Sequence, residues 1–143
     1  TGLPARRRIT GPEDARRQAL RFFAAATPTV VAVDAPPGRD QAAWALEVCL
    51  ALRVAAVWAA VDATRKPADL ARTLDGLGRV EALAVHRVAE CADPTTVLDL
   101  GVPVALLDGL PATRPVWVAL LEEQAGVVLD RDHRWRRVRQ GVA

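Results

Sequence analysis

The sequence lacks several residue types, and each absence narrows what the chain can do. It contains no Met, no Tyr and no Ser, and it has a single Lys. Without Ser, every mechanism that depends on a serine nucleophile is excluded. The positive charge is carried almost entirely by Arg, a bias that is typical of a high-GC bacterium. Because the chain starts at Thr1 and has no Met, we expect a fragment or processed form of a longer protein.

Cysteine and histidine are also scarce, with two residues of each type. Cys49 and Cys91 show no metal-ligand spacing, so we predict free thiols and no metal site. No apolar run reaches the roughly 18 residues that a membrane-spanning helix needs. Nothing resembles a signal peptide. These observations predict a cytoplasmic protein in a reducing environment, with no membrane span.

The composition is that of an ordinary globular domain. The chain has 143 residues, of which 51% are hydrophobic and 25% charged, and we predict one α/β domain over 1–143. Within it, 1–9 is an exposed basic lead-in, and 127–143 is either a β-hairpin or a basic tail. The net charge of +2 is too small to argue for nucleic-acid binding by itself.

Apolar strands and amphipathic helices alternate along the chain. The strands are predicted at 29–34, 54–62, 81–85 and 102–107. The helices are predicted at 11–26, at 39–53, from Pro67 to Leu77 with Gly78 closing it, from Asp93-Pro94 to Gly101, and from Thr113 onward. The strands are apolar throughout, which is typical of parallel strands that are buried on both faces. The pattern predicts a three-layer, doubly wound α/β fold with a mainly parallel sheet of at least four strands.

Polar residues follow the predicted strands, where an open parallel sheet binds its ligands. The candidate ligand-binding residues are Asp34, Gly38, Arg39, Asp62, Arg65, Lys66, His86 and Asp108, and the adjoining loops add Asp40, Thr64 and Arg87. Two interpretations stay open. Strand ends are polar wherever they meet water, and alternatively at least two of these side chains contact a ligand.

The stretch "VAVDAPPGRDQAA" at 31–43 has the layout of a phosphate-binding loop, with an apolar strand, a Pro/Gly turn and a helix start. A working phosphate-binding loop has the sequence pattern GxxxxGK[ST]. Here the four defining positions are occupied by Ala35, Asp40, Gln41 and Ala42. Asp40 places a negative charge where a phosphate would lie, which counts against nucleotide binding.

Over 29–124 the chain resembles the GTPase domain of the signal-recognition-particle type, especially its flagellar member. The segment "VDATRKPADLARTLDGLGRVEALAV" at 61–85 is similar to a strand, turn and helix of that family. The segment "GVPVALLDGLP" at 101–111 resembles its closing strand and turn. The family's guanine-reading Asp corresponds to Ala89, and its switch-region strands have no counterpart here. The resemblance implies a P-loop-NTPase-like fold that has lost its nucleotide chemistry.

Two alternatives to this interpretation remain. In a second registration, "AAVDATRKPADLARTL" at 59–74 corresponds to an earlier segment of the family, after its second strand. Alternatively, 31–43 is an unrelated strand-turn-helix that never bound phosphate.

An Arg-rich segment near the end of the chain is a candidate interaction surface, formed by Arg134, Trp135, Arg136 and Arg137. The nearby Asp130 and Asp132 offset its charge, which counts against nucleic acid as a partner. The other three Trp residues, Trp44, Trp58 and Trp117, are predicted to lie in the core.

Taken together, the sequence predicts a non-catalytic, pseudo-NTPase-like domain that acts through protein–protein contact as a regulator or scaffold. Its partner would be another protein or a second copy, and we assign no catalytic residue and no cofactor. One alternative is a small-molecule- or nucleotide-binding domain or enzyme that uses the strand-end residues. Another is nucleic-acid binding through the Arg clusters.

Overall fold

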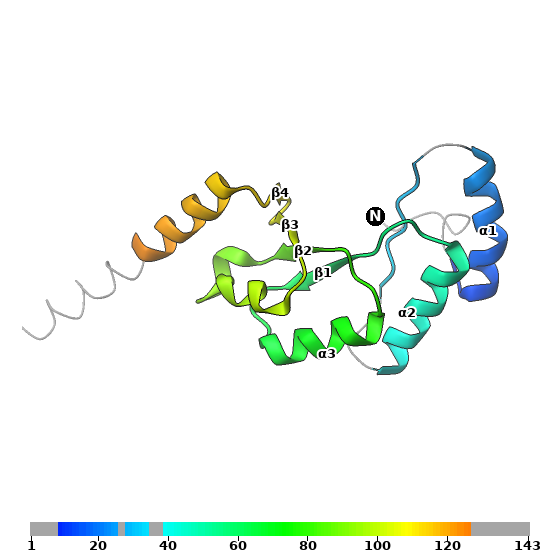
Figure 1. Cartoon of the computed structure of the whole chain (residues 1–143), viewed down its shortest axis with the longest axis horizontal. Helices are drawn as coiled ribbons and strands as arrows, with labels where there is room; N and C mark the ends of the chain where they lie inside the picture. The colour runs from blue at the N-terminus through cyan, green and yellow to red at the C-terminus, as the bar shows by residue number, and fades with distance from the viewer. Residues whose placement is uncertain (1–8, 26–27, 35–38, 127–143) are drawn as a thin grey trace, which may run out of the picture. The chain divides into compact units, whose positions relative to one another are not determined.

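The computed structural model describes residues 9–25, 28–34 and 39–126. They form two compact units. Figure 1 labels helices and strands. We call the first the helical unit; it takes in Thr1–Ala59 and Ala68–Glu81. The second, the sheet unit, takes in Ala60–Pro67 and Ala82–Ala143. The single domain expected from chain length stays a prediction, and each unit is described by itself.

The helical unit begins with α1 (Pro12–Ala25). Pro12 suits the first turn of a helix because its missing N–H would have no partner there. The backbone N–H of Thr10 donates to the carboxylate of Asp14 at 3.2 Å, so Asp14 accepts the bond that a capping box would assign to Glu13. The next helices are α2 (Arg39–Leu52) and α3 (Pro67–Leu77), of which Ala68 onward belongs to this unit.

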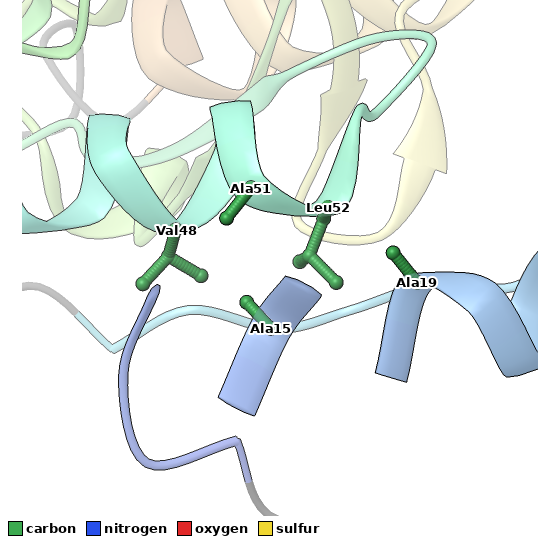
Figure 2. Packing of buried hydrophobic residues seen from close by; sticks show 5 residues of the cluster. All are labelled: Ala15, Ala19, Val48, Ala51 and Leu52. Carbon is green, nitrogen blue, oxygen red and sulfur yellow. The ribbon is translucent and has the colours of Figure 1, made fainter. Parts of the chain in front are cut away.

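Small apolar side chains hold α1 and α2 together (Figure 2). Ala15 and Ala19 of α1 face Val48, Ala51 and Leu52 of α2, and all five are buried. Side chains of this size let the two helices approach closely. Ile9, Phe22, Val31, Val33 and Trp44 pack around this cluster and are partly buried. The close approach extends to α3, where a Cβ placed on Gly76 would lie 2.8 Å from the Cβ of Ala42.

The sheet has the strand order β1-β2-β3-β4. Its strands are β1 (Trp58–Asp62), β2 (Ala82–His86), β3 (Val104–Leu107) and β4 (Leu110–Pro111). β2 and β3 are parallel, with Val85 opposite Leu107, whereas β3 and β4 are antiparallel. An α/β architecture with a mainly parallel sheet is therefore confirmed. The three-layer, doubly wound arrangement and the likeness to P-loop NTPases stay predictions.

Two 3₁₀ helices and one α-helix complete the described part of the sheet unit. They are η2 (Val88–Glu90), η3 (Pro94–Leu100) and the helix at 114–126, which is drawn in orange in Figure 1. Asp93 caps η3 by accepting from the amide and the hydroxyl of Thr95, at 3.3 and 2.6 Å. The buried core of the sheet unit includes larger apolar residues, namely Val61, Leu83, Val85, Val88, Val97 and Leu107.

The strand predicted at 29–34 is wrong. Residues 28–34 belong to no strand of the structure. Val31 and Val33 pack against the helical cluster, while Val30 is 96% exposed. A run of only four apolar residues, 30–33, cannot by itself distinguish a strand from an extended segment that packs on helices. The stretch that resembled the entry to a phosphate loop is therefore not a strand here.

The prediction that every strand is buried on both faces is also wrong, as β1 shows. Ala59 and Val61 are buried, but Trp58 and Ala60 are exposed, so β1 alternates in the way of a strand with one solvated face. Trp58, predicted to be core, is 56% exposed. β1 also begins later than predicted, at Trp58 instead of Val54. The hairpin or tail at 127–143 lies outside the described residues.

Candidate functional site

The carboxyl ends of the parallel strands bring polar residues to one edge of the sheet unit, as the sequence predicted. Asp62 ends β1, His86 ends β2, and Asp108 follows β3 directly. Backbone hydrogen bonds hold these ends in register. The amide of Ala63 donates to the carbonyl of His86 at 3.0 Å, and the amide of Asp108 donates to the carbonyl of Val85 at 2.8 Å.

Asp62, at the end of the outer strand β1, uses both carboxylate oxygens. Its Oδ1 accepts from the amide and the hydroxyl of Thr64, at 2.9 and 2.6 Å. Its Oδ2 accepts from Nη1 of Arg87 at 3.0 Å. The bonds from Thr64, supported by the nearby guanidinium, stabilise the charged form and lower the pKa of Asp62 to about 2.

Arg87 lies between two carboxylates. Its backbone is left-handed (φ 59°), and this conformation belongs to the turn between β2 and η2. Besides the bond to Asp62, its Nη2 and Nε donate to Oε2 of Glu90 at 2.5 and 3.1 Å. The bonds to Glu90 come first in raising the pKa of Arg87 further above its usual value, and the same contact lowers the pKa of Glu90.

Asp108 closes the cluster. Its Oδ2 accepts from the backbone N–H of Val88 at 3.1 Å, so the carboxylate fixes the start of η2. Its own backbone is left-handed (φ 45°). We call Asp62, Thr64, Arg87, Glu90 and Asp108 the strand-end cluster. Through their bonds to one another and to the amide of Val88, these residues tie three loops together. This is a structural role for Asp62 and Asp108, which the sequence predicted as ligand contacts.

Cys91 attaches the helix at 114–126 to the same edge. Its thiol donates to the carbonyl of Ala63 at 3.0 Å, and its carbonyl accepts from Nε2 of Gln124 at 3.0 Å. The thiol is free, as predicted, and so is that of Cys49. Burial raises the pKa of the Cys49 thiol, which keeps it protonated. Among the described residues, no group of His, Cys, Asp or Glu is arranged to hold a metal ion.

The remaining predicted residues are spread over both units. In the sheet unit, Arg65 is half-buried and Lys66 and His86 are exposed. In the helical unit, Asp34 is exposed and Arg39 is the first residue of α2. The structure therefore brings Asp62, His86 and Asp108 of the predicted set to one edge of the sheet. Gly38 and the surface formed by Arg134, Trp135, Arg136 and Arg137 lie outside the described residues.

Sequence reasoning placed Arg87 near the site but missed Glu90. The spacing of three residues between them was an available signal, because side chains three apart can meet on a helical turn. Thr64 and Asp62 also form a recognisable local pair, since an Asp can accept from the amide two residues later. No local pattern in the sequence could predict the hydrogen bond from Gln124 to the carbonyl of Cys91, because the two residues are 33 positions apart.

The described helices give no candidate membrane span, since none combines the length and apolar character that crossing a bilayer requires. No protein-family model, curated protein or solved structure matches the chain.

Proposed function

We propose that the chain is a non-catalytic interaction domain that regulates or scaffolds by contacting another protein. The observation that carries this proposal is the exposure of large apolar side chains on two helices. Leu20 and Phe23 of α1 are 74% and 60% exposed. Val118 and Leu121 of the helix at 114–126 are 45% and 41% exposed. Apolar side chains gathered on one helix face are typical of protein-contact surfaces.

The strand-end cluster supports the same proposal. Asp62, Arg87 and Asp108 already bond to groups of their own unit. A small-molecule ligand that recruited them would have to break those bonds and compensate for the loss. The alternative of a small-molecule site therefore has less support than protein contact, although exposed His86 ends β2 and exposed Lys66 lies in the loop after β1.

The relationship to P-loop GTPases is a separate hypothesis within this proposal. It is supported by α2, which begins at Arg39, close to where a phosphate loop would enter its helix. Asp40 and Gln41 then occupy the first turn, where a working loop needs Gly and Lys. Calorimetry with GTP, ATP and GDP, with and without Mg²⁺, is expected to give no heat at millimolar nucleotide. Micromolar, Mg²⁺-dependent binding would overturn the pseudo-NTPase.

Affinity capture with matched baits tests protein contact. The wild-type chain, Leu20→Asp and Leu121→Asp serve as baits in an extract of the cells that make the protein. A charge buried at the centre of an interface is expected to lower the yield of a specific partner about tenfold or more. Leu50→Asp is the matched control, because Leu50 on α2 is 67% exposed, close to Leu20 and more than Leu121. A set of captured proteins that is the same for all four baits would contradict the proposal.

A further inference from the structure

We draw no further inference here: the strongest candidate, the exposed apolar patch that Leu20 and Phe23 form on α1, belongs to the surface already proposed for protein contact, and nothing in the described part of the chain shows what covers it.

Discussion

The two units are held together in different ways. In the helical unit, α1 and α2 meet through small apolar side chains such as Ala15, Ala19 and Ala51 (Figure 2). In the sheet unit, a core of larger residues is supplemented by the strand-end cluster, in which Asp62 and Arg87 tie the loops together. The packing of α1 on α2 depends on side-chain volume. The sheet unit depends on side-chain volume and also on the charges of the strand-end cluster.

This difference shows where each unit tolerates change. Contacts between small side chains leave little room for an added methyl group, because protein interiors are packed at nearly crystalline density. A charged cluster tolerates changes in volume at its exposed side chains but not a change of protonation or of hydrogen-bond partner. The units should therefore respond oppositely to overpacking and to pH.

Removing volume from each core compares the two units directly, and it is expected to have the largest effect. Leu83 in β2 is fully buried, so Leu83→Ala should lower the free energy of unfolding by about 3 kcal/mol. Val48→Ala in α2 removes fewer atoms and should cost about 1.5–2 kcal/mol. Urea denaturation followed by circular dichroism measures both. Leu110→Ala, at an exposed position, is the control, and a larger loss for Val48→Ala would contradict the ranking.

Adding side-chain volume to the tightly packed helical unit should make the difference between the two units clearer. Gly76→Ala places a Cβ 2.8 Å from the Cβ of Ala42, which is closer than carbon atoms normally approach. The resulting overpacking costs about 1–3 kcal/mol, and the better helix propensity of Ala returns about 1 kcal/mol. A net loss of about 1 kcal/mol is expected in thermal or urea unfolding. In Gly126→Ala the new Cβ meets nothing within 4 Å, so that variant should be neutral or slightly stabilised.

The sequence predicted the helices well because their signals are local. The observed bounds of α1, α2 and α3 lie within a residue or so of the predictions. Capping and Gly residues set these ends, and Gly78 closes α3 with the left-handed backbone (φ 75°) that a helix end favours. The strand at 29–34 failed because pairing is a tertiary property. Val31 and Val33 found helices to pack against instead.

The candidate site was predictable only in part, for a related reason. The fold rule for parallel sheets correctly placed Asp62 and Asp108 at one edge. It could not say whether their carboxylates would remain open to a ligand or bond within the protein. That outcome depends on Glu90 and on the left-handed turn at Arg87, which only the folded chain shows.

Acid should weaken the sheet unit through Asp62, which is the smallest effect expected here. Its pKa is about 2 in the folded chain against an ordinary value of 3.8, so the folded state favours the charged form. A lowered pKa contributes stability that is fully present above about pH 4 and is lost as the pH falls towards 2. In Asp62→Asn this contribution is absent at every pH. The unfolding free energies of wild type and variant should therefore differ at neutral pH and converge near pH 2.

Urea denaturation at a series of pH values measures that convergence. Asp75→Asn, at an exposed position on α3, is the matched control and should keep the pH dependence of the wild-type chain. A difference between wild type and Asp62→Asn that stays constant from neutral pH to pH 2 would show that the carboxylate acts through shape and hydrogen bonding alone. Charge would then have no part in stabilising the strand-end cluster, and the two units would differ only in the size of their core residues.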